Sequence, residues 1–358
     1  MQQNQLLNRT AIYTFLFAVG ALAVIFYYSA HKIVVVADVA HDEVVQNNEP
    51  SEQEPAVIGQ QEKNEILFEL NGQEMNYFCI PLHDVVKAEN VTIENHYMDK
   101  ELWVSLRQPE LNKAFESFYQ TQGVYGNRDA VIDGYFEKGA DNFWLKFRLN
   151  DIYEYRSILE DNKLYIDFVA PKEVYDRIVV IDPAYGGDVT GAVSGELQGK
   201  DVTLEIAKAL KQKLDETDMK IYYTRMDDSA PSDENRIDLT NAVKADMMIR
   251  IEVSGNEDTK VYGTEAVYNS KFFIPGFGSV ELADLLEREV VTAISGKANG
   301  LVDAEEEDEV IRRANVPAAA IRVGYVTNGQ EAILLNREDY IEKIAEGIYQ
   351  TIQKAYTE

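Results

Sequence analysis

The chain has few of the side chains that bind transition metals. Its 358 residues include one cysteine and only four histidines: Cys79, His31, His41, His83 and His96. Zinc sites in proteins are built largely from imidazole and thiolate ligands. The sequence beyond residue 96 therefore offers neither kind of zinc ligand. A single cysteine also excludes an internal disulfide, so cysteine usage does not indicate the redox compartment.

Positive charge is also scarce. The chain has 34 Lys and Arg residues against 62 Asp and Glu residues, which gives a formal net charge of −28. Binding to nucleic-acid phosphates needs clustered Lys and Arg, so we predict no nucleic-acid partner. The same charge disfavours tight contact with anionic wall polymers, and its simplest interpretation is solubility.

One long uncharged run stands near the start of the chain, from Ala11 to Ala30. At 1.5 Å per residue, a helix of this length spans a bilayer core of about 30 Å. We therefore predict a transmembrane helix at 11–30 after a cytoplasmic tail at 1–10. A cleaved signal peptide is the alternative, with Val35-Val36-Ala37 as its cleavage site, although the run exceeds the usual ~7–15 apolar residues.

Two regions of different composition follow. Residues 31–64 are predicted to be an acidic linker, because the part after His41 is polar, bears prolines and has no apolar period. Residues 65–172 alternate apolar and polar positions and predict a small β-rich domain, with a helix possible at Leu111–Gln120. Its aromatic residues between Phe115 and Tyr155 suggest either a sugar-stacking surface or a β-domain core, where aromatic residues are common.

Six sequence segments after residue 176 occur in a recognisable order. They are the strand-like RIVVIDPAYGG (Arg177–Gly187), the helical GKDVTLEIAKALKQKL (Gly199–Leu214), KIYYTRMDD (Lys220–Asp228), a segment with Arg236 and Asn241, ADMMIRIEVSGN (Ala245–Asn256) and NVPAAAIRVGYVTN (Asn315–Asn328). In the first helix, the apolar residues recur every four positions, which predicts a face packed on a sheet.

This order resembles the zinc-dependent N-acetylmuramoyl-L-alanine amidase family over about residues 177–355. The resemblance implies an α/β domain at 173–358, with a mostly parallel or mixed central sheet flanked by helices. It also implies a peptidoglycan substrate and a large domain outside the cytoplasm. We therefore expect a single-pass protein of the cell membrane whose carboxyl-terminal domains are extracytoplasmic.

The positions that carry the family's chemistry differ in this chain. The resemblance places the first zinc histidine at Tyr185, the zinc glutamate at Gly199, the second zinc histidine at Glu252 and the catalytic glutamate at Arg322. All four residue types are changed, so we predict no catalytic residue, no metal ligand and no cofactor, although the family would use zinc. The residues that bind substrate are not identified by the sequence.

Other arrangements of these residues are possible. Four carboxylates, Asp182, Asp188, Glu196 and Glu252, are candidates for an oxygen-ligand site for a hard cation. Glu252 and Arg322 are predicted to form an ion pair in the altered pocket, because a lone buried charge is costly. Alternatively, both side chains point into solvent. The acidic segment Asp303–Glu309 is either a solvated loop or a docking segment for a basic partner.

Two functions follow from these observations. The first is a membrane-anchored, catalytically inactive amidase-like protein that binds peptidoglycan or a cell-envelope partner in wall remodelling, division or sporulation. The alternative is an active N-acetylmuramoyl-L-alanine amidase that hydrolyses the lactyl–L-alanine amide bond of peptidoglycan. Since a fold can host several functions, the residues of the site decide between the two.

Overall fold

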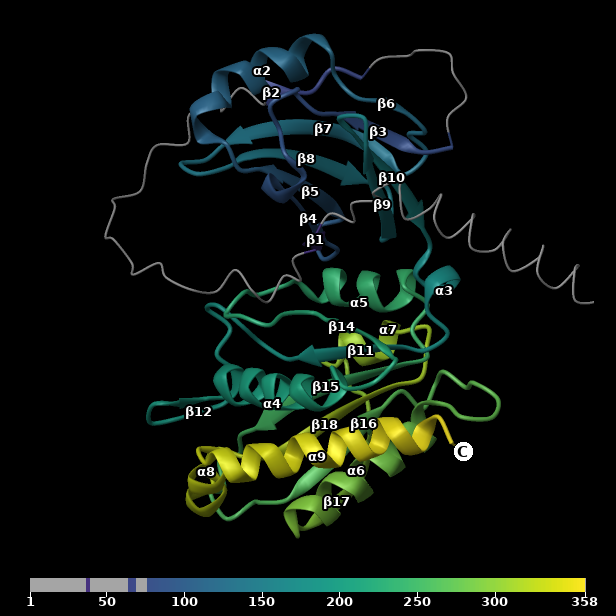
Figure 1. Cartoon of the computed structure of the whole chain (residues 1–358). Coiled ribbons are helices and arrows are strands. Elements are labelled where there is room, and N and C mark those ends of the chain that lie inside the picture. The colour runs from purple at the N-terminus through teal and green to yellow at the C-terminus, as the bar shows by residue number, and fades with distance from the viewer. Residues whose placement is uncertain (1–36, 39–63, 69–75, 358) are drawn as a thin grey trace, which may run out of the picture. The chain divides into compact units, whose positions relative to one another are not determined.

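The structure is a computed structural model that describes residues 37–38, 64–68 and 76–357 (Figure 1). The predicted tail at 1–10, the predicted transmembrane helix at 11–30 and nearly all of the predicted linker at 31–64 lie outside the described residues. Among the residues described, no helix has the length and apolar character needed to cross a membrane.

The chain divides into two compact units. The amino-terminal unit comprises the described residues up to Asn95 together with Leu102–Asn150 and Tyr155–Phe168. The carboxyl-terminal unit comprises His96–Glu101, Asp151–Glu154 and the residues from Val169 onward.

The amino-terminal unit is built mainly of strands. Its six-stranded sheet has the order β1 (Ala37–Asp38), β4 (Val91–His96), β5 (Glu101–Leu106), β8 (Phe143–Leu149), β7 (Val131–Lys138) and β2 (Asn64–Glu65). A four-stranded sheet has the order β6 (Tyr125–Gly126), β3 (Phe78–Pro81), β10 (Lys163–Val169) and β9 (Glu154–Glu160). The helices are α2 (Asn112–Thr121) and two short 3-10 turns, η2 (Ala88–Asn90) and η3 (Pro109–Leu111).

Five of the aromatic residues that suggested a sugar-stacking surface lie in the core of this unit. The buried ones are Phe115, Tyr119, Phe136, Phe143 and Phe147. Phe136 and Phe143 stack with ring centroids 5.2 Å apart, and strand alternation directs both inward. These five positions therefore bear out the interpretation as a β-domain core.

The carboxyl-terminal unit contains a mixed sheet of six strands. Their order is β14 (Lys220–Tyr223), β11 (Ile178–Pro183), β15 (Met247–Ser254), β18 (Ala318–Tyr325), β16 (Thr264–Tyr268) and β17 (Ala298–Asp303). The first four strands are parallel, β16 is antiparallel to β18, and β17 runs parallel to β16. A two-stranded hairpin, β12 (Val193–Ser194) and β13 (Leu197–Gln198), follows β11.

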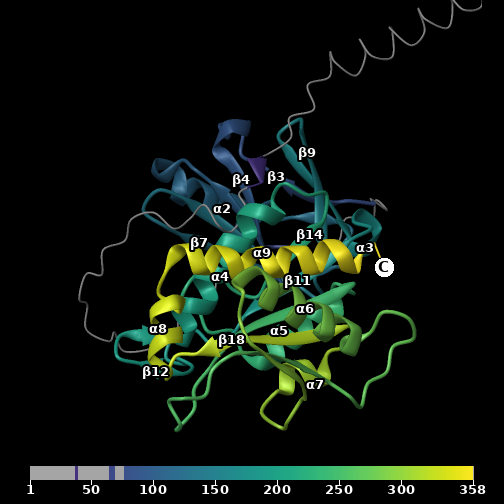
Figure 2. The same ribbon diagram turned by 90° about the horizontal axis from the view of Figure 1, so that it is seen from below.

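Helices cover both faces of this sheet, as Figures 1 and 2 show. One face packs on α4 (Gly199–Leu214), α6 (Ser279–Ile294) and α9 (Glu338–Ala355), and the other on α5 (Asp233–Ala242) and α7 (Glu309–Arg313). The remaining helices are the short α3 (Pro171–Val174) and α8 (Gly329–Leu335), and Leu335 at the end of α8 is buried in the core on the α4 side. The prediction of an α/β fold with a mixed central sheet flanked by helices is confirmed.

The helix over Gly199–Leu214 shows why the sequence forms these layers. Its predicted apolar face, Val202, Ile206, Leu210 and Leu214, is buried in the core on the α4 side of the sheet. Helix α5 begins at an N-cap serine, Ser232, whose side chain accepts a hydrogen bond from the Asn235 amide at 3.2 Å. Apolar periodicity and capping together fix the positions of these helices.

Candidate functional site

Strand alternation places a row of charges on the α5 side of the sheet. Residues Ile178, Val180, Met248 and Ala320 point to that side and are apolar and buried. Farther toward the carboxyl ends of the same strands, the alternation continues with charged residues. In the strand register, Asp182 pairs with Arg250, and Arg322 lies between Glu252 and Glu265. Since paired residues point to the same face, these five side chains form one polar cluster.

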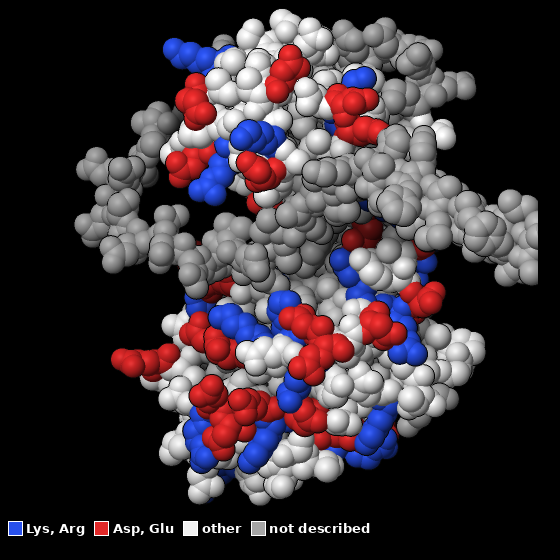
Figure 3. All heavy atoms as spheres, in the orientation of Figure 1, with Lys and Arg blue, Asp and Glu red and all other residues white. Residues whose placement is uncertain are grey.

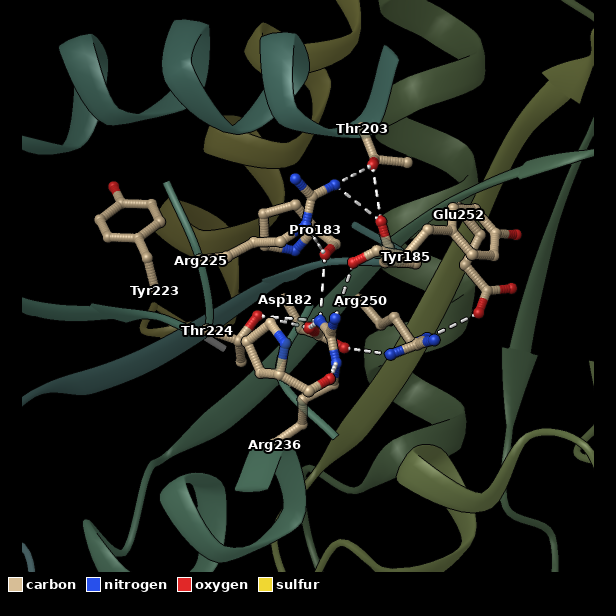
Figure 4. A network of polar contacts seen from close by, with 12 residues as sticks. Asp182, Pro183, Tyr185, Thr203, Tyr223, Thr224, Arg225, Arg236, Arg250 and Glu252 are labelled. Atoms are coloured by element: carbon tan, nitrogen blue, oxygen red, sulfur yellow. Dashed lines mark hydrogen bonds and ion pairs between the residues drawn. The ribbon is translucent and has the colours of Figure 1, made fainter. Parts of the chain in front are cut away.

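Asp182 is the innermost member of this cluster and is fully buried. Its carboxylate forms ion pairs with Arg236 and Arg250 and accepts a hydrogen bond of 2.5 Å from Thr224 Oγ1 (Figure 4). Burial raises the pKa of Asp182, but the two guanidinium groups and the Thr224 hydroxyl outweigh burial and lower it to about 2. Asp182 is therefore ionised at neutral pH, and its negative charge stabilises the guanidinium groups of Arg236 and Arg250.

Glu252 and Arg322 continue the chain of alternating charges. Glu252 accepts from Arg250 Nε at 2.6 Å and from Arg322 Nε at 3.1 Å. The predicted Glu252–Arg322 pair is therefore confirmed, and the alternative in which both side chains point into solvent is wrong. Glu252 is only 8% exposed, so its contact with two arginines offsets the cost of burying its charge.

Arg322 has two further carboxylate partners. Its Nη1 lies 3.1 Å from Glu265 Oε1, and its Nη2 lies 2.8 Å from Asp308 Oδ1. Burial disfavours the charged guanidinium, but Glu252, Asp308 and Glu265 outweigh this effect and raise the pKa of Arg322 further above its ordinary value. The cation holds together three carboxylates that come from two strands and a loop.

Tyr185 occupies the space beside Gly199, the position at which the resemblance places the family's zinc glutamate. Its backbone has φ 70°, and its hydroxyl donates to the Val253 carbonyl at 3.2 Å. A Cβ atom on Gly199 would lie 3.3 Å from the Tyr185 ring, and one on Gly191 would lie only 2.6 Å from it. The tyrosine ring therefore fills the volume into which a side chain at position 199 would extend. Burial is the largest effect that raises the pKa of Tyr185, to about 12, so its oxygen stays protonated at neutral pH.

Two arginines hold the loop that carries Tyr185. Arg225 donates from Nε to the Pro183 carbonyl at 3.0 Å and from Nη2 to the Ala184 carbonyl at 2.8 Å (Figure 4). Arg236 donates from Nη2 to the Tyr185 carbonyl at 2.8 Å. These bonds satisfy the three consecutive carbonyls, so the loop keeps a fixed shape at the end of β11.

These residues do not fit a zinc ion. Gly199 has no donor atom, Tyr185 is a protonated phenol, and Arg322 is a cation that cannot accept a proton. Of the four family positions, only Glu252 has a carboxylate, and two arginines already bind it. In the part of the chain that the structure describes, no group of three or more His, Cys, Asp or Glu side chains is arranged to hold a metal ion.

The candidate hard-cation site is not assembled. Asp182 and Glu252 both bind Arg250, whereas Asp188 and Glu196 are exposed on the loop and hairpin after β11. The sequence interpretation also missed Arg250, Arg236, Glu265 and Asp308. Arg250 precedes Glu252 by two residues on one strand, so the strand period could have identified it. No local sequence pattern identifies Glu265 and Asp308 as partners of Arg322, because only tertiary contacts bring them to it.

The comparisons with known proteins described here all find N-acetylmuramoyl-L-alanine amidases. A family model described as N-acetylmuramoyl-L-alanine amidase matches residues 179–354. The germination-specific N-acetylmuramoyl-L-alanine amidase of Bacillus subtilis (strain 168) is 27% identical over 234 residues, which cover 60% of this chain and 95% of the relative. The crystal structure of an N-acetylmuramoyl-L-alanine amidase from Clostridium difficile 630 has 30% sequence identity. The matched region covers 51% of this chain and 97% of the chain in that crystal structure, with a TM-score of 0.47.

Proposed function

We propose that this chain, which belongs to the N-acetylmuramoyl-L-alanine amidase family, is a binding protein of the cell envelope. In this proposal it does not hydrolyse the lactyl–L-alanine amide bond of peptidoglycan. Its ligand is peptidoglycan or an envelope protein, and its role is to scaffold or regulate wall remodelling. Division and sporulation are the processes that need such remodelling. The germination-specific name of the Bacillus subtilis relative supports a setting in sporulation.

The surroundings of Arg322 are the observation that carries this proposal. Zinc amide hydrolysis needs a metal that activates water and a carboxylate that accepts its proton. At the position where the resemblance expects the carboxylate, Arg322 offers only donors. Its guanidinium already binds Glu252, Glu265 and Asp308. A zinc ion at this place would meet a cation of like charge and would find its nearest carboxylates already paired.

The preserved scaffold supports a binding role. The loop after β11 is held by Arg225 and Arg236 through its carbonyl groups. Val189 and Val193, which follow in the same connection to α4, are 58% and 45% exposed. A loop of fixed shape that presents apolar side chains can contact a ligand without metal chemistry, because ordering it costs little entropy on binding.

An active amidase is the alternative function, and the family match over residues 179–354 is the observation in its favour. It requires a metal site made from residues other than those at the family positions. Release of stem peptides from peptidoglycan by the purified protein, with loss of activity on chelation, would establish this alternative.

We further propose that the chain is a single-pass protein of the cell membrane with its carboxyl-terminal units outside the cytoplasm. The uncharged run from Ala11 to Ala30 supports this topology. An impermeant protease added to wall-stripped intact cells should cut within residues 41–64. Cleavage that occurs only after lysis would contradict this topology.

Sedimentation with insoluble peptidoglycan tests the proposed function. Full-length protein in detergent should pellet with the polymer, and no stem peptide should appear in the supernatant. Val189→Asp with Val193→Asp should reduce the pelleted fraction, whereas Val280→Asp, on the exposed surface of α6, should not. Peptide release would favour the alternative function, and equal pelleting of all three proteins would refute binding through this loop.

A further inference from the structure

The loop between β16 and α6, residues 270–278, carries aromatic side chains into solvent. Its sequence is SKFFIPGFG, and it projects from the carboxyl-terminal unit in Figures 1 and 2. Phe273 is 80% exposed and Phe272 is 37% exposed, whereas Phe277 packs against the core. Contiguous exposed apolar side chains, unlike isolated ones, are a mark of interaction sites, and Phe272 and Phe273 are adjacent in the sequence. We call residues 270–278 the Phe loop.

Hydrogen bonds fix both ends of the Phe loop. Asp303 Oδ1 accepts from the Ser270 amide at 3.0 Å, and Asn269 Oδ1 accepts from the Lys271 amide at 3.0 Å. At the other end, Glu281 Oε2 accepts from the Gly278 amide at 2.9 Å. The two exposed phenylalanines therefore project from a loop with an ordered base, which reduces the entropy lost when a partner binds.

An acidic segment lies directly beside the Phe loop. Strands β16 and β17 are parallel, and their last residues, Tyr268 and Asp303, pair with each other. The Ala304 amide donates to the Tyr268 carbonyl at 2.9 Å, so the chain after β17 starts beside the loop. Glu305, Glu306 and Glu307 follow and are exposed. Within the described residues, none of these three side chains has an ion pair or a hydrogen bond.

We propose that the Phe loop and the glutamates at 305–307 form a docking surface for a partner protein that presents an apolar pocket bordered by Lys and Arg. The phenylalanines act as the buried anchors, and the glutamates pair with the basic border and steer association. This surface deepens the proposed binding role and rests on it, because it supplies a site for an envelope partner. The glutamates precede Asp308, whose carboxylate accepts from the Glu305 amide and binds Arg322, so one end of this surface adjoins the charge cluster.

Charge excludes two other occupants. A bilayer rich in anionic lipid would repel the three glutamates next to the phenylalanines. A second copy of the chain carries the same net charge of −28. The groove of about 780 Å³ between α4 and α9 is also a poor receptor, because six carboxylates and three cations line it, for a net charge of −3. Figure 3 shows acidic and basic side chains interspersed on the face of the molecule that carries α4 and α9.

Photo-crosslinking of the full-length protein in the cells that produce it tests the proposal. With p-benzoylphenylalanine at position 272, we expect a discrete adduct with another protein, and its crosslinked peptide should lie on a surface rich in Lys and Arg. The same probe at position 333 is the control, because Ile333 is 68% exposed but lies on α8. Position 333 should not form this adduct.

Two variants make the test specific. Phe273→Asp should lower the adduct yield about tenfold or more, since burying one phenylalanine side chain is worth that much in affinity. Glu305→Lys, Glu306→Lys and Glu307→Lys together should lower it by a similar factor. The matched control reverses three exposed carboxylates elsewhere, Glu205→Lys, Glu216→Lys and Glu342→Lys, and should preserve the adduct.

Several results would overturn the proposal. They are an adduct with lipid, an adduct with a second copy of the chain, no adduct, or an adduct whose yield is unchanged by reversal of the three glutamates. Stem-peptide release by the wild type and by Phe273→Asp is measured in parallel. Release would refute the proposed non-hydrolytic function without changing the crosslinking result, so the two failures are distinguishable.

Discussion

Replacement of Arg322 by alanine should destabilise the carboxyl-terminal unit and leave the amino-terminal unit unchanged. Arg322 is the cation shared by Glu252, Glu265 and Asp308. Without it, Glu252 still has Arg250, at 2.6 Å. Glu265 and Asp308 lose their ion-pair partner, although their side chains are only 17% and 7% exposed. Two carboxylates are then held out of water without a compensating charge.

The magnitude follows from this burial. Removing one partner of a fully buried ion pair costs about 3–5 kcal/mol. The Arg322 side chain is 25% exposed, so water compensates part of the loss, and we expect about 2–4 kcal/mol. In a unit of this size, such a loss lowers the melting temperature by roughly 5–10 °C. Arg322→Lys keeps the charge but cannot reach three carboxylates at once, so its loss should be intermediate.

The positions of the tryptophans allow each unit to be followed separately. The chain has two tryptophans, Trp103 and Trp144, and both lie in the amino-terminal unit. Tryptophan fluorescence during thermal unfolding should therefore show an unchanged transition in Arg322→Ala. Hydrogen exchange of the β15 and β18 amides should accelerate, because these strands carry Glu252 and Arg322.

Arg288→Ala is the matched control in the same unit. Arg288 pairs with Asp284 at 2.9 Å on the surface of α6, and the two side chains are 53% and 62% exposed. Loss of such a pair costs less than about 1 kcal/mol. If Arg322→Ala destabilises the unit no more than Arg288→Ala does, the charge cluster has no structural role and our interpretation of Arg322 is wrong.

Two further predictions concern Asp182 and Gly199. Because the pKa of Asp182 is lowered from 3.8 to about 2, its contribution is present above pH ~4 and is lost as the pH falls toward 2. It amounts to about 2 kcal/mol, and acid titration of unfolding should show this step in the wild type but not in Asp182→Asn. Gly199→Glu should destabilise the unit because Tyr185 fills the adjacent space, and Tyr185→His should relieve most of that loss. Equal losses in both backgrounds, measured by thermal unfolding, would contradict the steric argument.

Local patterns in the sequence were sufficient for much of the carboxyl-terminal fold. The helix predicted at Gly199–Leu214 is observed over the same residues, because its apolar period and the strand before it are both encoded locally. The Glu252–Arg322 pair could also be predicted, since the resemblance placed both residues in the pocket. These inferences needed only periodicity and the order of segments.

The remaining partners of Arg322 could not be predicted, because tertiary structure brings them together. Glu265 reaches Arg322 because β16 is antiparallel to β18, and one sequence does not specify that register. Asp308 reaches Arg322 from an acidic segment that the sequence analysis interpreted as either solvated or docking. The contact of the Tyr185 ring with Gly199 also depends on a left-handed backbone at Tyr185, which is uncommon for a residue other than glycine.

Zinc content measured together with stem-peptide release is the most direct test of the central claim. Full-length protein would be purified with zinc in the medium, analysed for metal, and incubated with peptidoglycan before and after chelation. Because the resemblance assigns the family's metal and catalytic positions to residues that include Tyr185, Gly199 and Arg322, we predict far less than one zinc per chain and no release of stem peptide. Stoichiometric zinc, with peptide release that chelation abolishes, would contradict the claim.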